Sequence, residues 1–258
     1  MTTDDIGNVP ESPVTLLDDP RIQTDHLRLL VDDESSVLLV GVVHDHPASV
    51  YRVRRVVRSL DPDTVAVELP PLALPLFEAG EGGEMSAALA ASDAGAAAID
   101  AHGPRFLAAL AGEISDRSPE RGTIGRIASN AVTVGKHALS CRLASVFGRD
   151  RFPTPLADAG VEIDLDRTAD PVTVAEHEQR HLSRSFSVLR AFERPAADEI
   201  VDAARERTMA RSLAGLDAES AVAVVGFEHL DGIADELVAR GVGPRAIDAT
   251  ALSEIAKK

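Results

Sequence analysis

The chain has 258 residues, and its 26 lysines and arginines stand against 42 aspartates and glutamates, which gives a net charge of −16. A surface this acidic repels phosphates and anionic lipid headgroups, so we expect no nucleic-acid partner. The single cysteine, Cys141, excludes an internal disulfide and a cysteine-rich zinc site. We expect no membrane span and a cytoplasmic protein, because no apolar run is long enough to cross a bilayer and the acidic start does not resemble a signal peptide. Few lysines and many alanines complete a composition typical of proteins from salt-loving organisms.

The first predicted elements follow a polar opening. Residues 1–33 are mostly polar and acidic, and we predict a loose lead-in there. A valine-rich run over about 36–43 predicts a buried strand, which passes through Gly41-Val42-Val43-His44 into a helix that begins at Pro47. Apolar residues recur on this helix at helical spacing, and Asp61-Pro62-Asp63 ends it.

A second short strand over 64–67 ends at Glu68 and completes a strand–helix–strand unit. Such units are right-handed and their strands are parallel, so both strands end at the same edge of a sheet. We therefore expect His44 and Glu68 to leave neighbouring strands at that edge.

The rest of the chain is helical in its middle and repeats the opening pattern near its end. A helix over about 84–94 and a short strand near 96–99 precede a mainly helical insertion over about 103–215. A strand over 221–225 then leads into Gly226-Phe227-Glu228-His229, a helix to Arg240 and a last strand near 245–247. These elements predict one α/β domain over 34–258, in which helices flank a central mixed, partly parallel sheet.

The middle of the chain also carries a local reversal of charge. Residues 117–151 contain seven arginines and lysines against two acids. One interpretation is a helix whose cations pair with acidic neighbours, and the other is a surface for a partner or an anionic ligand. The alanine-rich helices of this region would also suit the interface of a homodimer.

The two strand-end histidines and Glu68 are the candidate site. Ligands of layered α/β folds bind at the carboxyl ends of the strands. Two imidazoles and a carboxylate form a common ligand set for Zn²⁺, Mn²⁺ or Co²⁺, which leaves positions open for water and substrate. We therefore predict His44, His229 and Glu68 as metal ligands. Without a metal, one histidine and Glu68 could activate water directly.

Further residues of this candidate site are predicted from their charge. Arg207 could stabilise an oxyanion, and Glu206 or Glu84 could orient a ligand or move protons. The charged helix around them, which also carries Arg205 and Arg211, is as consistent with a solvated face or a structural ion pair.

Five fragments in order resemble the TraB/PrgY family, which is related more distantly to the Tiki and GumN proteins and to the erythromycin esterase group. They are Gly41-Val42-Val43-His44 with Ser49, Asp61 to Leu69, Gly83-Glu84-Met85, Glu206 to Ala210, and Val224 to Gly232. The resemblance covers roughly residues 36–100 and 195–240.

The resemblance implies a compact α/β fold in which both histidines and the strand-end glutamate face one cleft. Tiki proteins are regarded as metal-dependent proteases, whereas most TraB-like proteins have no assigned reaction. The chain departs from the family pattern at 70–74, where no arginine or tyrosine follows Glu68, and at Asp100-Ala101-His102, which keeps only the aspartate of an Asp-Arg pair. The leading hypothesis is a metal-dependent hydrolase of peptide, amide or ester bonds. The alternative is a non-catalytic regulatory module that binds or sequesters a peptide or small signal.

A second motif competes for the same chemistry. His177-Glu178-Gln179-Arg180-His181 fits HExxH, the zinc-protease signature, and Glu199 or Glu206 could be offered as its third ligand. Genuine motifs lie in buried helices among uncharged residues, whereas Glu176, Arg180 and Arg184 adjoin these histidines. We therefore interpret this match as a chance one.

Overall fold

The computed structural model describes residues 12–80, 82–129, 165, 169–191 and 195–256, with side chains left out over 185–191. Among these residues no helix combines the length and the apolar character that crossing a bilayer requires.

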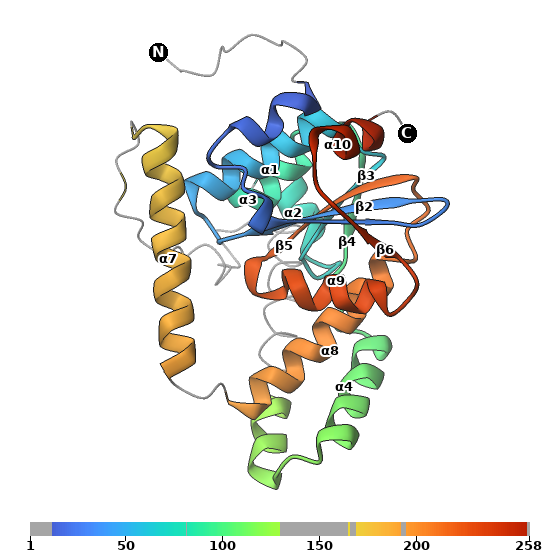
Figure 1. Ribbon diagram of the computed structural model, residues 1–258. Coiled ribbons are helices and arrows are strands. Elements are labelled where there is room, and N and C mark those ends of the chain that lie inside the picture. The colour runs from blue at the N-terminus through green and yellow to red at the C-terminus, as the bar shows by residue number, and fades with distance from the viewer. Residues whose placement is uncertain (1–11, 81, 130–164, 166–168, 192–194, 257–258) are drawn as a thin grey trace.

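A six-stranded sheet is the centre of the molecule (Figure 1). Its strands stand in the order β4-β3-β5-β2-β1-β6. The four strands β4, β3, β5 and β2 are parallel, while β1 is antiparallel to both β2 and β6. The sheet is therefore mixed and mostly parallel, and the predicted α/β class is confirmed. The strands are β1 (Leu27–Val31), β2 (Ser36–Val42), β3 (Thr64–Val67), β4 (Gly95–Ala98), β5 (Ser220–Gly226) and β6 (Gly243–Arg245).

Helices cover both faces of the sheet. Successive residues of the central strands point to opposite sides, so both faces carry apolar side chains that must be buried. Leu38 belongs to the hydrophobic core on one face of the sheet and Leu39 to the core on the other face. Every residue of β2 and β5 is buried. In Figure 1 the first face lies beneath α1 and α3, with α10 and the 3₁₀ helix η1 beside them, and the second lies against α9 and the end of α8. These helices are α1 (Pro47–Leu60), α3 (Gly83–Leu89), α8 (Ala196–Leu213), α9 (Leu230–Val238), α10 (Ala249–Ile255) and η1 (Pro13–Asp18).

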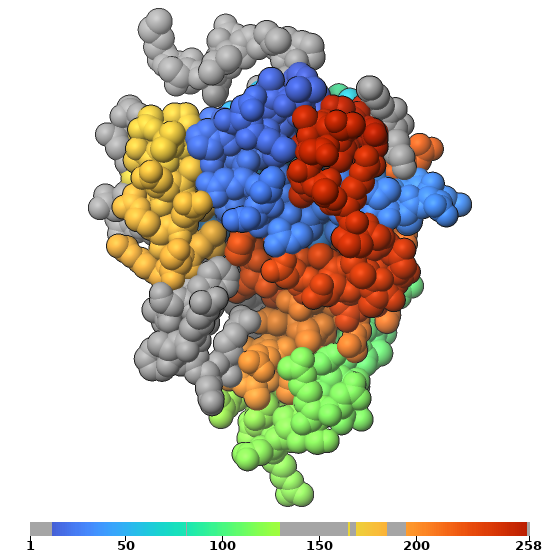
Figure 2. Space-filling view, viewed as in Figure 1, coloured from blue at the N-terminus to red at the C-terminus, as the bar shows by residue number. Residues whose placement is uncertain are grey.

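The described part of the middle region is helical. The helix α4 (Pro104–Arg117) packs along α8 through Phe106, Leu110 and Ile200 and extends away from the sheet (Figure 1). The helix α7 (Pro171–Ala191) lies beside α1 on the flank of the molecule, where Figure 2 shows it in yellow against the blue N-terminal segments. The short helices are α2 (Leu74–Glu78), η2 (Thr24–His26) and η3 (Phe227–His229).

The predicted loose lead-in is wrong for residues 12–33, while residues 1–11 lie outside the described part. Residues 27–31 form β1, whose Leu27 is paired with Val40 in the interior of the sheet. Leu16 and Ile22 are also buried in the core. The apolar side chains of this segment that enter the core are few, and acidic residues lie among them. The local sequence pattern is therefore weak, because β1 is stabilised by its pairing with β2. The last strand likewise lies at 243–245, slightly before the predicted 245–247.

Candidate functional site

The carboxyl ends of four parallel strands bring the predicted residues to one edge of the sheet. His44 follows β2, Glu68 follows β3, Asp100 follows β4 and His229 follows β5. The register aligns these ends, because Val42 pairs with Gly226 and the Glu68 amide donates to the carbonyl of Val224 at 3.0 Å. Residues that are far apart in the sequence therefore converge, as parallel pairing requires.

His44 forms a pair with Glu84 at this edge. The His44 Nδ1 atom lies 2.7 Å from Glu84 Oε1, and the Asp45 amide donates to Glu84 Oε2 at 3.0 Å. The His44 side chain is 63 % exposed and that of Glu84 is 4 % exposed. A buried carboxylate with both oxygens engaged thus holds one nitrogen of an imidazole that stands in solvent.

Local backbone geometry makes this pair possible. Asp45 has a φ of +58°, so the chain turns sharply directly after His44. Gly83 has a φ of +71° at the start of α3, and a Cβ there would lie 2.9 Å from Asp45 Oδ1. The start of α3, with Glu84 as its second residue, therefore packs closely against the turn that carries His44.

The pair shifts both pKa values. The hydrogen bond to Glu84 raises the pKa of His44 to about 9 against the opposing effect of burial, and the charges of Glu84 and Glu68 act in the same direction. Burial by itself would raise the pKa of Glu84, but the hydrogen bond and charge of His44 outweigh it, so the pKa lies below its ordinary value. His44 is therefore protonated at neutral pH. Because the imidazole is largely exposed, water screens the pair and its contribution to stability is small.

A second group lies at the neighbouring strand ends and is called the Arg205 cluster here: Glu68, Asp100, Arg205 and His229. The Arg205 Nη2 atom donates to Glu68 Oε1 at 2.6 Å and to Asp100 Oδ2 at 2.9 Å, and Nη1 lies 2.9 Å from His229 Nε2. The other Glu68 oxygen accepts from the Gly226 amide at 2.6 Å. Burial lowers the pKa of Arg205, but the two carboxylates raise it more, so the guanidinium stays charged.

His229 is held from both of its nitrogens. Because Arg205 can only donate, Nε2 accepts, and Nδ1 donates to Glu206 Oε1 at 3.0 Å. Burial lowers the pKa of His229, but the hydrogen bond to Glu206 and the charge of Glu68 raise it further, so the pKa lies above its ordinary value. His229 is 1 % exposed, which makes it an interior member of the cluster, in contrast to His44.

No protein-family profile, curated protein or solved structure matches this chain. The resemblance to the TraB/PrgY proteins therefore depends on the sequence motifs alone. The candidate site is supported by the contacts among its own side chains.

The arginine at the cluster is Arg205, whereas sequence reasoning proposed Arg207. Arg207 instead lies 2.8 Å from Glu113 of α4 and 3.2 Å from Glu236 of α9. Two residues on a helix are about 200° apart, so Arg205 and Arg207 face different sides. The available signal was the spacing of Arg205 to Met209 and Leu213, which places all three on the stripe that packs against the sheet.

In this arrangement the side chains proposed as metal ligands bond to other groups. Glu68 and His229 already direct their lone pairs at Arg205 and the Gly226 amide, so a metal ion would compete with a guanidinium for them. His44 bonds to Glu84 rather than to either of them. The described residues contain no group of three or more histidine, cysteine, aspartate or glutamate side chains placed to hold a metal ion. A bound Zn²⁺, Mn²⁺ or Co²⁺ stays a prediction that metal analysis of the purified protein tests.

The HExxH residues have contacts that differ from those of a zinc site. Glu178 is 1 % exposed and forms an ion pair with Arg52 of α1. His177 Nδ1 lies 3.0 Å from His46 Nε2. The two glutamates offered as third ligands are engaged elsewhere, Glu199 with Arg117 and Glu206 with His229.

The basic segment is described only over 117–129. Arg117 lies 3.2 Å from Glu113 and 3.8 Å from Glu199, as expected if cations of this segment pair with acidic neighbours. Residues 130–151 lie outside the described part, so the role of the segment and a dimer through the middle helices stay predictions.

Proposed function

We propose that the protein is a hydrolase of peptide, amide or ester bonds in which His44 is the general base. The observation that supports this proposal best is the His44–Glu84 pair: an exposed imidazole at the carboxyl edge of a parallel sheet, with Nδ1 held by a buried carboxylate. This arrangement leaves Nε2 as the nitrogen that takes a proton, with the orientation of the imidazole set by the protein.

In the proposed reaction, water lies between His44 Nε2 and the carbonyl carbon of the substrate. The neutral imidazole takes a proton from the water as the oxygen bonds to the carbon, and the carbonyl π electrons move to the oxygen. When the tetrahedral intermediate collapses, the bond to the leaving group breaks and His44 returns the proton to that group. Glu84 stabilises the imidazolium formed between these two steps.

The Arg205 cluster places one guanidinium between two carboxylates at the neighbouring strand ends, so the cluster has no net positive charge. Arg205 stays charged and is partly exposed, with 22 % of its side chain accessible. In this proposal an exposed N–H group of Arg205 donates to the developing oxyanion, because a preorganised donor lowers the energy of the transition state without reorganisation. Glu68 and Asp100 hold the guanidinium in place, which makes them positioning residues in this proposal.

A pH–rate profile on a substrate panel tests the proposal. The panel consists of p-nitrophenyl esters and aminoacyl p-nitroanilides. Because only about one imidazole in a hundred is neutral at pH 7 when the pKa is about 9, kcat/KM should rise about tenfold per pH unit to about pH 9. His44→Gln should abolish hydrolysis. Glu84→Gln should move the inflection toward 6.5, whereas the control Glu176→Gln on the exposed face of α7 should leave it in place.

Two results would contradict the proposal. One is hydrolysis that survives His44→Gln, because another base must then act. The other is a folded wild-type protein that hydrolyses no compound of the panel, which would favour a cytoplasmic module that binds a peptide or small ligand.

A further inference from the structure

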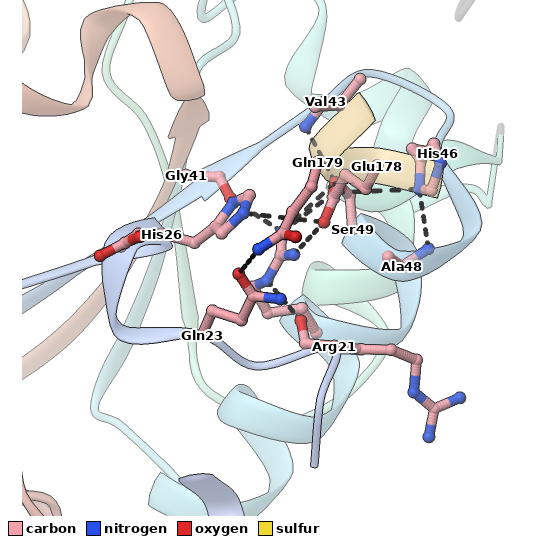
Figure 3. A network of polar contacts seen from close by, with 12 residues as sticks. Arg21, Gln23, His26, Gly41, Val43, His46, Ala48, Ser49, Glu178 and Gln179 are labelled. Carbon is pink, nitrogen blue, oxygen red and sulfur yellow. Dashed lines mark hydrogen bonds and ion pairs between the residues drawn. The ribbon is translucent and has the colours of Figure 1, made fainter. Parts of the chain in front are cut away.

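A network of buried polar side chains lies outside the candidate site, between α1 and α7 (Figure 3). Arg52 is 0 % exposed and forms its ion pair with Glu178, while its Nη1 donates to the carbonyl of Gly41 at 3.0 Å and its Nε to the carbonyl of Arg21 at 2.9 Å. The Ser49 hydroxyl donates to Glu178 Oε1 at 2.6 Å. Charges this deeply buried persist only when their hydrogen bonds are satisfied, and here α7 supplies the anion.

This buried group reaches the backbone that carries His44. The Ser49 hydroxyl oxygen accepts from the Val43 amide at 2.8 Å, so a chain of hydrogen bonds runs from Val43 through Ser49 to Glu178. Val43 directly precedes His44, and its carbonyl accepts from the His46 amide at 3.1 Å to close the turn. Arg52 fixes the same strand end a second time through Gly41. Figure 3 shows Val43, Ser49 and Glu178 grouped together.

Further contacts fix how α7 lies on this region. His46 Nδ1 accepts from the Ala48 amide at 3.1 Å, so Nε2 carries the proton and donates to His177 Nδ1 at 3.0 Å. Gln179 donates to Gln23 at 2.6 Å, which ties the same turn of α7 to the N-terminal segment. Hydrogen bonds of His177 and Gln179, on either side of Glu178, therefore fix the orientation of α7 against α1.

We propose that Glu178 of α7 is a positioning residue for His44, and that it acts through Ser49 and the Val43 amide. Its catalytic meaning rests on the proposed function, whereas the coupling itself can be measured without a substrate. Two residues of the HExxH match thus have structural contacts, because His177 bonds to His46 in the turn before α1 and Glu178 bonds to Ser49 in the first turn of α1. In this proposal α7 completes the candidate site, although Glu178 lies 134 positions after His44 in the chain (178 − 44).

The test compares two variants with two matched controls. Ser49→Ala removes the hydroxyl that links Val43 to Glu178, and Glu178→Gln keeps the shape but removes the charge. Ser59→Ala removes another buried hydroxyl of α1 that has no hydrogen-bond partner among the described residues, and Glu176→Gln removes an exposed charge from α7. Circular dichroism and size-exclusion chromatography establish that each variant folds.

Two measurements on the full-length protein then report on the turn. Amide hydrogen exchange at Val43 should become at least tenfold faster in Ser49→Ala, and NMR titration should show the pKa of His44 falling toward 6.5 in both test variants because the contact to Glu84 loosens. Both controls should match the wild type. A merely structural loss of stability would speed exchange throughout the core but would leave the His44 titration unchanged.

An unchanged His44 titration in folded Ser49→Ala and Glu178→Gln would overturn the proposal. If Glu178→Gln does not fold, Ser49→Ala decides, because it leaves the ion pair of Arg52 and Glu178 in place. Failure of the proposed hydrolysis would not affect these measurements, so the two proposals fail separately.

Discussion

Two histidines buried beside Glu178 should make the protein sensitive to mild acid. Burial lowers the pKa of His26 to about 4, and the charge of Arg52 adds to this effect. Burial likewise lowers the pKa of His46 to about 4, although Glu178 opposes the shift. Both residues are 2 % exposed or less. Each therefore stays neutral in the folded protein under conditions where the unfolded chain takes up a proton.

The sign and size follow from proton linkage. A folded pKa below the unfolded value of 6.5 gives stability that is complete above pH 6.5 and is lost as the pH falls toward 4. For each histidine the loss amounts to about 3 kcal/mol between pH 7 and pH 4. This loss is a large fraction of the free energy of unfolding of a typical protein, which is about 5–15 kcal/mol.

The assay is urea unfolding at several pH values between 7 and 4, with the free energy of unfolding extrapolated to zero urea. His46→Gln retains an acceptor for the Ala48 amide and a donor for His177 but cannot titrate. Its loss of stability over this range should be smaller than that of the wild type by about 3 kcal/mol. The control Ser59→Ala should follow the wild-type pH dependence, since it removes no titratable group. Parallel curves for His46→Gln and the wild type would refute the reasoning.

Three further substitutions have expected outcomes. Gly83→Ala forces a residue with a Cβ into a positive φ and should cost about 1–2 kcal/mol in urea unfolding; an unchanged midpoint would show that the turn relaxes freely. In Gly232→Ala the new methyl group overlaps the Glu206 carboxylate, so NMR titration should show a lower pKa for His229, and an unaltered titration would contradict the contact. Arg205→Gln leaves two buried carboxylates without their cation and should cost about 3–5 kcal/mol. A change below 1 kcal/mol in the same measurement would mean that the cluster is not a buried ion network.

The central fold was predictable because its strands are strongly apolar and follow one another with clear turn residues. The runs that became β2, β3 and β5 are buried on both faces, as valine-rich parallel strands usually are. Parallel pairing then places His44 and Glu68 at one edge, and this follows from the sequence without knowledge of the packing. The prediction that their strands are neighbours is wrong, because β5 lies between β2 and β3 and pairs with both. The strand β1 escaped prediction because its five residues have a partner only once β2 lies next to them.

Residue patterns did not predict the contacts between segments that are far apart in the sequence. Glu84 was predicted to orient a ligand or move protons, but nothing in its own segment indicates that it bonds to His44. The choice between Arg205 and Arg207 depends on the rotation of α8 against the sheet, which is set by Met209 and Leu213. His46 is fully buried and caps α1, and nothing in its own segment indicates this role. Such roles arise from tertiary packing, which single-sequence patterns do not encode.

The measurement that tests the account most directly is an NMR titration of the His44 imidazole in the wild type and in Glu84→Gln. The account predicts a pKa near 9 in the wild type, because Glu84 accepts a hydrogen bond from Nδ1, and a value near 6.5 in the variant. An ordinary pKa near 6.5 in the wild-type protein, unaffected by Glu84→Gln, would show that the imidazole is not held by this carboxylate. The proposed general base would then have no support in the structure.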